Sequence, residues 1–578
     1  MFAMAMLLII LLSLLLYLGT RKPKGYPPGP KWWPILGCAI EMARMRKSSG
    51  YLFKTCSDLS EQYGPVIGLK LGKDYIVVVN DYESIREVLV NPDFDGRPIG
   101  LMYKTRTFGL RRGLIVVDED FWVEQRRFVL RHLREFGFGR NSMTTAIEFE
   151  ASGLVEHIKN LMHKEHNKTA NDIGIPYNNN NRDNGQIYKM AKEKNKEESP
   201  LESLDNSSSI KKMPKVADLY VNANDYVEVR KMSQSSEVVI SMHNAFGVSV
   251  LNSIWTMITG KRFNHGDKKL LHLQSILTKV LQETDMIGAP FGHFPVLSYI
   301  APEKSGYKTF LQTHQELWEF LKEELENHKN TYQEDSPRDL IDVYLAALKS
   351  GNYGDSFSVS NTLLIRYVTE SQLLGICVDL FVAGSETTSK TLAFCFLYLI
   401  LYPNVQKKAQ EEIDRIIGRN RCPTLVDKTR MTYVNAIVLE SLRMFIGRTL
   451  NVPHRALKET FIKGHRIPKV SDTMIVVNYN GILMCESWTD PELFRPERFI
   501  DDTGNISIPP KFFPFGIGRH RCIGEGVARS NIFAITTTLL QTFTFSAVPG
   551  EEKPSCKDFV DGVTAGPVPF RALVKLRT

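Results

Sequence analysis

Residues 512–526 read FFPFGIGRHRCIGEG and place one cysteine, Cys522, in a short loop rich in glycine and in cations. Arg519, His520 and Arg521 come directly before it. A thiolate at such a position can be a nucleophile, a zinc ligand or an axial ligand of haem iron. The residues around Cys522 decide among these three kinds of site.

These surroundings favour a haem ligand. A nucleophile needs an oriented base, and His520 does not align easily with a thiol two positions away in a tight loop. Zinc needs further ligands, yet no two of the eight cysteines form a CxxC pair. An iron porphyrin needs one sulfur, and its two propionates need cationic donors. From this stretch alone, an inert buried cysteine in a basic loop remains the alternative.

The stretch FGIGRHRCIG resembles the haem-binding motif of the cytochrome P450 family, F-x-x-G-x-R-x-C-x-G. Phe515, Gly518, Cys522 and Gly524 match, whereas His520 stands where the family has arginine. The resemblance implies that Cys522 is the axial ligand of the haem iron and that the other matching residues, with His520, surround the cofactor. A histidine can donate to a propionate but carries no permanent charge, so the strength of that contact stays open.

Two stretches upstream of Cys522 together resemble a second motif of the family. Glu440 and Arg443, in ESLR, are spaced i, i+3 and share one face of a predicted helix. Such a pair is common by chance, but Arg498 follows in RPERF, in the order that the family requires. The resemblance implies a buried ion network of these three residues that supports the haem loop and has a structural role.

A third motif lies upstream, where WVEQR places Trp122 four residues before Arg126. It resembles the W-x-x-x-R helix of the family, and the resemblance implies that both side chains reach a haem propionate. An ordinary amphipathic helix end is the alternative for this stretch alone.

Residues 379–392, DLFVAGSETTSKTL, put polar residues into an otherwise apolar helix. Polar residues there cost stability unless they have a role. We expect Gly384 and a threonine hydroxyl to loosen the helix and open a groove, with a simple kink as the alternative. The family carries A/G-G-x-D/E-T-T/S at this place. The resemblance implies that Ala383 and Gly384 lie against the cofactor, and that Glu386 and Thr387 are catalytic and deliver protons to oxygen.

The N-terminal end predicts a membrane anchor. The first 19 residues carry no charge, and as a helix they would span roughly 28 Å, about the thickness of the hydrocarbon layer. A cleaved signal peptide is the alternative. Arg21, Lys22 and Lys24 follow, which favours a cytosolic location for what comes next. We expect an anchor at 1–20, a basic and Pro-rich neck at 21–34, and a cytosolic haem-thiolate monooxygenase domain at 35–578.

The body predicts a mainly α-helical fold with small β-sheets, and the resemblance implies the cytochrome P450 fold. Two strands are expected around Gly72 and Lys73, followed by a helix that ends at Pro92. A final apolar helix is expected from about Gly526 to Phe543. Residues 165–234 are rich in Asn, Lys and Ser and lack periodicity through most of their length, which predicts a disordered insertion.

The resemblance implies a membrane-anchored monooxygenase that inserts one oxygen atom from O2 into a small lipophilic substrate. It most resembles animal microsomal members, and among these the insect developmental type that processes steroid-like or terpenoid-like hormones. The implied cofactor is haem b, with NADPH used indirectly. The implied partners are NADPH–cytochrome P450 reductase, cytochrome b5 and the endoplasmic reticulum membrane. The net charge of +8 does not by itself indicate nucleic acid.

Two alternatives remain from the sequence. One is a monooxygenase that detoxifies foreign lipophilic compounds. The other is a haem protein that does not oxygenate, such as a sensor, a carrier or an isomerase. The presence of Glu386 and Thr387 argues against the second, because those functions need no proton relay. The segments expected to select the substrate are 99–120, 284–302, 449–454 and the helix that holds Phe381 and Ala383, which are apolar enough for a lipophilic ligand.

Overall fold

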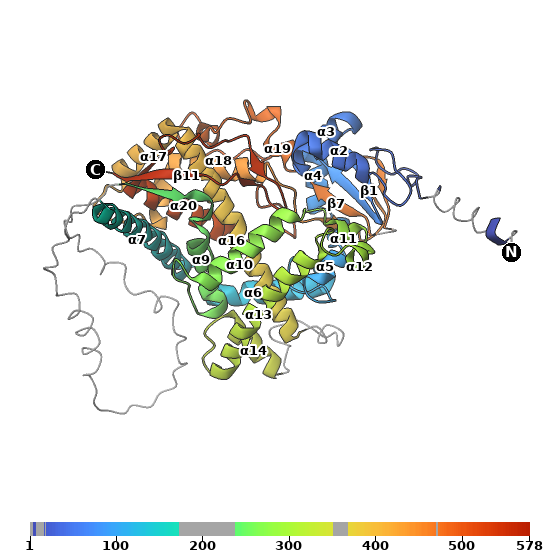
Figure 1. Ribbon diagram of the computed structural model, residues 1–578, viewed down its shortest axis with the longest axis horizontal. Helices are drawn as coiled ribbons and strands as arrows, with labels where there is room; N and C mark the ends of the chain where they lie inside the picture. Colours follow the sequence, from blue (N-terminus) through green and yellow to red (C-terminus); the bar gives the residue numbers. More distant parts are fainter. Residues whose placement is uncertain are drawn as a thin grey trace.

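The structure is a computed structural model that describes residues 4–6, 17, 19–172, 237–350, 368–469 and 472–577. This part of the chain is mainly helical and carries four small sheets. The fold class predicted from the sequence is therefore confirmed. Helices α7, α9, α17, α18 and α20 lie on one side of the molecule, and the largest sheet lies on the other side, near α2, α3 and α4 (Figure 1).

The largest sheet has the strand order β1-β2-β7-β4. Its strands are β1 (Val66–Leu71), β2 (Asp74–Val79), β7 (Met474–Val477) and β4 (His454–Arg455). β1 and β2 form the expected hairpin around Gly72, and β7 pairs in parallel with β2 although it lies some 400 residues later. The helices near this sheet are α2 (Ala39–Ser49), α3 (Leu52–Tyr63) and α4 (Tyr82–Val90).

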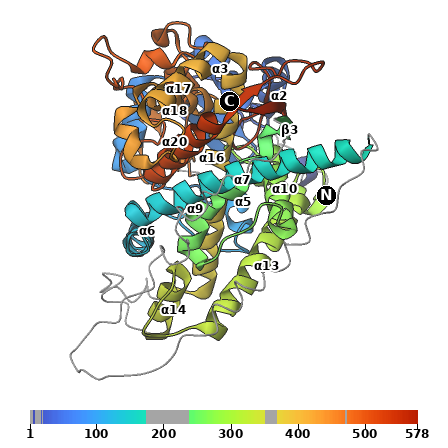
Figure 2. The ribbon, with the colours of Figure 1, turned by 90° about the vertical axis from the view of Figure 1, so that its left-hand side faces the viewer.

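The long helices form the rest of the body (Figure 2). They are α6 (Glu119–Glu135), α7 (Asn141–Asp172), α9 (Gly247–Thr259), α10 (Lys268–Glu283), α13 (Tyr307–Thr331), α14 (Leu340–Ser350), α16 (Glu370–Leu401), α17 (Pro403–Ile416), α18 (Thr432–Ile446) and α20 (Glu525–Thr542). The amphipathic runs of the sequence account for α10, α13 and α17, because each buries one apolar stripe. α20 is the expected final apolar helix.

Shorter elements complete the described part. The helices are α5 (Leu101–Thr105), α11 (Pro290–His293), α12 (Leu297–Ile300) and α19 (Asn480–Leu483), with 3-10 turns η1 (Pro92–Phe94), η4 (Met242–Asn244), η5 (Leu425–Arg430), η6 (Glu486–Trp488) and η7 (Pro496–Phe499). The remaining strands form three sheets, ordered β3-β11-β8, β5-β6 and β10-β9. They are β3 (Glu237–Ser241), β5 (Thr460–Ile462), β6 (His465–Ile467), β8 (Phe543–Ser546), β9 (Phe559–Val560), β10 (Gly566–Pro567) and β11 (Arg571–Leu576).

Helix α16 passes through the middle of the molecule (Figure 1) and contacts α9, α13, α18 and α20. The sequence predicts that this helix is loosened around Gly384, but the structure shows one continuous helix over Glu370–Leu401. The reason is that its hydroxyl groups bond back to carbonyl oxygens one turn earlier, as Ser385 does to Phe381 and Thr387 to Ala383. The polar groups are thereby satisfied without a break in the helix.

Two predicted segments fall largely outside the described residues. Among the residues that the structure describes, no helix is long and apolar enough to cross a membrane. Most of the predicted anchor, residues 1–3, 7–16 and 18, lies outside them, as do residues 173–236 of the predicted insertion. Helix α7 continues to Asp172 and so includes the first eight residues of the predicted insertion, 165–172. A polar segment can extend an established helix, since propagation avoids the cost of nucleation.

Candidate active site

Cys522 lies in the loop directly before α20. Its backbone N–H donates to the carbonyl of Phe515 at 2.9 Å, and the N–H of Gly524 points at its sulfur. The side chain is accessible to solvent although much of the protein lies around it, which indicates a hollow rather than an outer surface. Burial raises the pKa of the thiol, while the Gly524 N–H and the positive charges of Arg126 and Arg521 act in the opposite direction.

The shape of this loop depends on Gly518. Its φ is +75°, and an added Cβ would lie 2.0 Å from the carbonyl oxygen of Leu89 on α4, so no larger residue fits. Phe515 packs under the guanidinium of Arg529, with 5.1 Å between the cation and the ring centre. The loop is therefore fixed between α4 and α20, which sets the place of Cys522.

Helix α6 packs directly on the Cys522 loop. The rings of Trp122 and His520 lie 4.1 Å apart, and Arg126 donates from Nη2 to the carbonyl of Arg521 at 2.7 Å. The guanidinium of Arg126 also lies 5.3 Å from the centre of the Trp122 ring. The structure thus brings together the two predicted residues of α6 and the predicted histidine of the loop.

His520 is a neutral donor in this structure. Its Nε2–H donates to the carbonyl of Asp95 at 2.9 Å. Burial, together with the nearby positive charge of Arg97 and the nearby His454, lowers the pKa of His520 to about 2. The position that holds arginine in the family motif therefore carries no fixed positive charge here.

Sequence reasoning missed two residues of this cluster, Arg97 and His454. Arg97 is buried and donates from Nη1 to the carbonyls of Val452 and Pro453, whereas its Nε has no hydrogen-bond partner. The ring of His454 lies 5.4 Å from that of His520. A single arginine and a single histidine, far apart in the chain, have no spacing pattern that could have indicated them.

These residues fit a flat cofactor that carries carboxylates. An orphaned guanidinium nitrogen is costly in a buried place unless an anion uses it. The tryptophan, arginine and histidine side chains converge from four different parts of the chain beside an accessible thiol. This donor set suits a haem, whose iron takes a thiolate and whose propionates take such donors.

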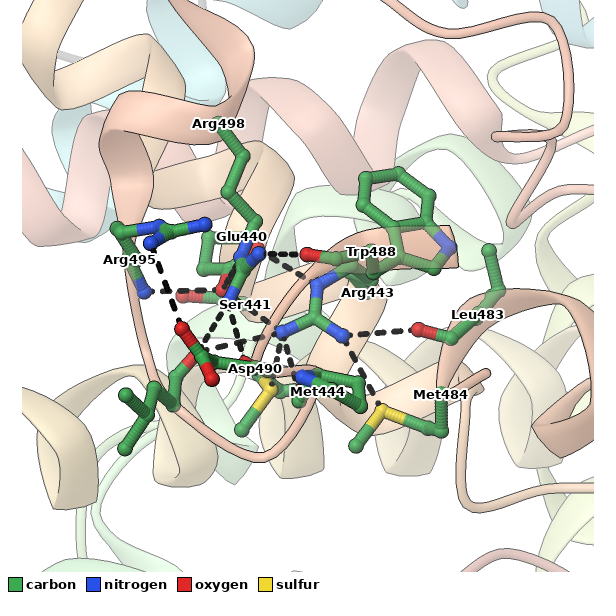
Figure 3. Close-up of polar contacts among 12 residues, drawn as sticks. Glu440, Ser441, Arg443, Met444, Leu483, Met484, Trp488, Asp490, Arg495 and Arg498 are labelled. Atoms are coloured by element: carbon green, nitrogen blue, oxygen red, sulfur yellow. Dashed lines mark hydrogen bonds and ion pairs between the residues drawn. The ribbon is translucent and has the colours of Figure 1, made fainter. Parts of the chain in front are cut away.

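The predicted ion network of Glu440, Arg443 and Arg498 is present (Figure 3). Glu440 and Arg443 are fully buried on α18 and form two parallel bonds of 2.7 and 2.8 Å. Arg498 donates to the same carboxylate at 3.1 Å, and Arg443 also donates to the carbonyls of Leu483 and Pro491, each at 2.8 Å. The network therefore ties α18 to residues 483–498.

An aromatic contact continues this support toward the thiol. Phe499, at the end of η7, packs edge-on against Phe512 at 4.8 Å between ring centres. Phe512 begins the stretch that leads to Cys522. The network thus holds the chain that enters the Cys522 loop, which is a structural role.

The predicted site residues of α16 face different neighbours. Ala383 is exposed although Phe381 and Ser385 on either side of it are buried, so a hollow borders this face of the helix. Gly384 faces α9, where an added Cβ would lie 3.2 Å from Ile254. Glu386 is partly buried and lies 3.0 Å from the ammonium of Lys390.

Two of the predicted substrate segments, residues 99–120 and 284–302, contact each other, and the first of them is bound to α16. Residues 99–120 are bound to α16 by Asp379, which pairs with Arg106 and accepts the N–H groups of Leu114 and Ile115. A separate apolar cluster then joins α5, α10, α11 and α13. Its members are Val280, Ala289, Phe291 and Phe310, with Leu101, Met102 and Tyr307 packed against them.

Comparison with known proteins identifies this arrangement. A sequence model described as Cytochrome P450 matches residues 27–184 and 189–574. The chain belongs to the cytochrome P450 family. It is 36% identical to "Probable cytochrome P450 303a1" of Drosophila melanogaster over 97% of each chain. It is 30% identical to "Farnesoate epoxidase" of Bombyx mori over 99% of each chain, and 30% identical to "Cytochrome P450 2J3" of Rattus norvegicus over 96% of this chain and 92% of the relative.

As a cytochrome P450 the protein is a monooxygenase, an oxidoreductase, and the enzyme class predicted from the sequence is confirmed. Members of this family hold a haem through a thiolate, receive electrons from a redox partner and act on lipophilic substrates. The cluster around Cys522 is the place in this chain that fits such a cofactor.

Proposed function

We propose that this P450 is an endoplasmic reticulum enzyme that inserts one oxygen atom from O2 into a small terpenoid-like or steroid-like substrate. The electrons come from NADPH through NADPH–cytochrome P450 reductase, with cytochrome b5 as a second donor. The observation that carries the proposal is the accessible Cys522 thiol beside a converging set of propionate donors.

Each residue of that cluster has a proposed part. Cys522 would hold the haem iron through its thiolate, which the N–H of Gly524 would stabilise by donating to the sulfur. The proposed propionate donors are Arg97, Trp122 and Arg126, while His520 and His454 pack beside them and give their own N–H groups to the carbonyls of Asp95 and Phe94. Haem b, when bound, supplies the activation of O2.

Thr387 and Glu386 are the proposed proton carriers. Thr387 lies one helical turn after the exposed Ala383, and its hydroxyl donates to the Ala383 carbonyl at 2.9 Å. That hydroxyl keeps its lone pairs for a proton donor such as water. Glu386 is next to it in the chain and is ion-paired. Alcohol and acid together can move protons in a defined direction.

The proposed substrate class rests on two observations. The relative from Bombyx mori that matches over 99% of both chains is named for farnesoate, a terpenoid acid. The packed cluster that joins α5, α10, α11 and α13 is apolar and aromatic, with Phe291 and Phe310 buried against each other. Apolar surroundings of this kind favour a lipophilic ligand.

A basic face supports docking of an acidic electron donor. Arg127, Arg131 and Arg134 are exposed and spaced four and three residues apart on α6, the helix that touches the Cys522 loop. Arg127 pairs with Glu124 and Arg131 with Glu135 on the same helix, so an acidic partner would compete with these two carboxylates. An open hollow of about 590 Å³ lies against the outside of that loop, and its lining includes Phe515 and Arg521. Cations around an apolar floor suit an acidic protein partner.

Exposed apolar side chains support contact with a membrane. They are Val296, Tyr299 and Ile300 around α12, and Trp33, Ile35 and Leu36 near the N-terminal end. Both groups border the turn between β1 and β2, because the N–H of Gly72 donates to the Leu36 carbonyl and that of Lys73 to the His293 carbonyl. β1, α11 and α12 share one side of the molecule (Figure 1). This face would extend the membrane contact of an N-terminal anchor.

The experiment uses the full chain with lipid vesicles, reductase and NADPH. Terpenoid acids, terpenoid esters and steroids are supplied in parallel with a panel of foreign lipophilic compounds. We expect product formation that consumes both NADPH and O2, and the highest kcat/KM for a terpenoid or a steroid. A preference for foreign compounds would contradict the proposed substrate class, and product without NADPH consumption would indicate an isomerase.

A further inference from the structure

Lys390 is a buried ammonium on α16, one turn after Glu386. Its Nζ lies 3.0 Å from Glu386 Oε1 and donates to the carbonyl and hydroxyl oxygens of Thr564 at 2.9 and 3.1 Å. Only 12% of the Lys390 side chain and 14% of the Glu386 side chain are exposed. The ammonium thus makes two hydrogen bonds to Thr564 and one ion pair to Glu386.

Placing the Lys390 ammonium here lowers the stability of the fold unless its charge is compensated. α16 is otherwise apolar on most of its surface, and a lysine that leaves water there pays a large desolvation penalty. The stem of Lys390 also packs against β10, since an added Cβ on Gly566 would lie 3.3 Å from its Cε. Lys390 therefore has both an oppositely charged partner, Glu386, and a closely packed space for its stem beside β10.

The pair lies where the proposed proton path runs. Ala383, Thr387 and Lys390 are spaced i, i+4 and i+7, so they follow one face of α16, the face on which Ala383 is exposed. Glu386 borders this face and also accepts a long hydrogen bond of 3.4 Å from Thr278 of α10. Its carboxylate is thereby held from α10, from α16 and, through Lys390, from Thr564.

The geometry of the pair leaves the carboxylate able to turn. Oε1 of Glu386 is within ion-pair distance of Lys390 but makes no aligned hydrogen bond. An attraction of this kind keeps the carboxylate nearby without using its lone pairs in a fixed direction. Glu386 can then accept and release a proton beside Thr387.

We propose that Lys390 is a positioning residue for proton delivery, which holds the Glu386 side chain beside Thr387 and ties it to the loop at Thr564. The inference rests on the proposed monooxygenase function. It assigns a part of that function to a residue whose own atoms touch neither substrate nor cofactor. Removal of Lys390 should therefore affect how protons are delivered and leave cofactor binding intact.

The test compares the holoenzyme with Lys390→Met, Lys390→Arg and the double variant Glu386→Gln/Lys390→Met. The matched control is Lys159→Met, which removes an exposed lysine that pairs with Glu156 on α7. The readouts are product formed per NADPH consumed, hydrogen peroxide, and the solvent deuterium isotope effect on product formation. Hydrogen exchange of residues 559–567 and the reduced carbon-monoxide spectrum report on the loop and on the cofactor site independently of turnover.

We expect Lys390→Met to lower product per NADPH by about threefold or more, with a larger isotope effect, faster exchange in residues 559–567 and an unchanged spectrum. Lys390→Arg should restore most of the ratio, and Lys159→Met should match the parent. In the Glu386→Gln background, Lys390→Met should add no further loss, because Lys390 acts through that carboxylate.

An unchanged product ratio in Lys390→Met would overturn the inference, and so would a loss that adds fully to that of Glu386→Gln. If Lys390→Met does not fold, Lys390→Gln, which keeps a donor for Thr564 without a charge, gives the same comparison. A parent enzyme without a thiolate-type spectrum would instead overturn the proposed function itself, so the two failures are distinguishable.

Discussion

Arg126 on α6 donates a hydrogen bond of 2.7 Å to the backbone carbonyl of Arg521, the residue directly before Cys522. The two arginines are 395 positions apart in the chain. The contact joins the helix that carries Trp122 to the loop that carries the thiol, and it places a guanidinium close enough to oppose the rise in the pKa of Cys522. The proposed ligand and the proposed propionate donors are therefore held as one unit.

Arg126→Met should weaken cofactor retention. The variant loses a charged hydrogen bond to the loop and a proposed propionate donor, and such a bond contributes about 1.5–3 kcal/mol, so haem should dissociate roughly 10- to 100-fold faster. Transfer of haem to an excess of apomyoglobin measures this rate. The exposed Arg44→Met on α2 is the control. Equal rates for Arg126→Met and the parent would remove Arg126 from the cofactor site.

Glu440→Ala should strongly destabilise the fold. It leaves the fully buried guanidinium of Arg443 without its carboxylate, and breaking a buried ion pair from one side costs about 3–5 kcal/mol. Urea unfolding of the holoenzyme measures the change in the free energy of unfolding, with the exposed Glu156→Ala as the control. A loss below about 1 kcal/mol would show that the network does not support the fold.

Thr387→Ala should uncouple the enzyme and leave it folded. Without the hydroxyl, protons are delivered with less direction, so NADPH consumption continues while hydrogen peroxide rises and product falls. The lost bond to Ala383 should change the free energy of unfolding by about 1 kcal/mol at most. The measurement is product formed per NADPH consumed. A ratio equal to that of the parent would direct attention to Glu386 or Thr388.

The buried His314 on α13 should make the protein less stable in mild acid. Burial lowers its pKa to about 4, below the value of about 6.5 in the unfolded chain. As the pH falls below 6.5 the unfolded chain binds a proton that the folded protein does not, so stability decreases until about pH 4 and no further. From pH 7 to pH 5 this histidine should cost up to about 2 kcal/mol.

Urea unfolding of His314→Gln at both pH values measures this contribution. The variant should lose less stability than the parent between pH 7 and pH 5, whereas the exposed His272→Gln on α10 should behave like the parent. Identical pH dependence in the parent and in His314→Gln would show that folding does not lower the pKa of His314.

The sequence predicts the parts of the site whose residues are close together in the chain. Cys522 and its loop, Glu440 with Arg443, and the α16 motif are each contained in a short stretch, so residue type and spacing suffice. Arg498 is found because it comes in a fixed order after them. The hairpin of β1 and β2 is predicted for the same reason, since both strands and the turn at Gly72 lie in one short stretch.

The parts that the sequence does not predict depend on long-range packing. Arg97 and His454 gain a role only because β4 and the segment after η1 meet beside His520. Lys390 appears as one polar residue among several until Thr564, 174 positions later, supplies its oxygens. The sequence does not predict that α16 is continuous, because hydroxyl groups that bond within the helix have no distinct pattern in the sequence.

The most direct test of the account is the spectrum of the reduced protein with carbon monoxide, for the parent and for Cys522→His. The parent should show the red-shifted absorption band of a thiolate-bound haem. Cys522→His should retain haem through the donors at Arg97, Trp122 and Arg126, and its band should move to the position of an imidazole-bound haem. A parent-like band in Cys522→His would contradict the assignment of Cys522 as the ligand and, with it, the proposed function.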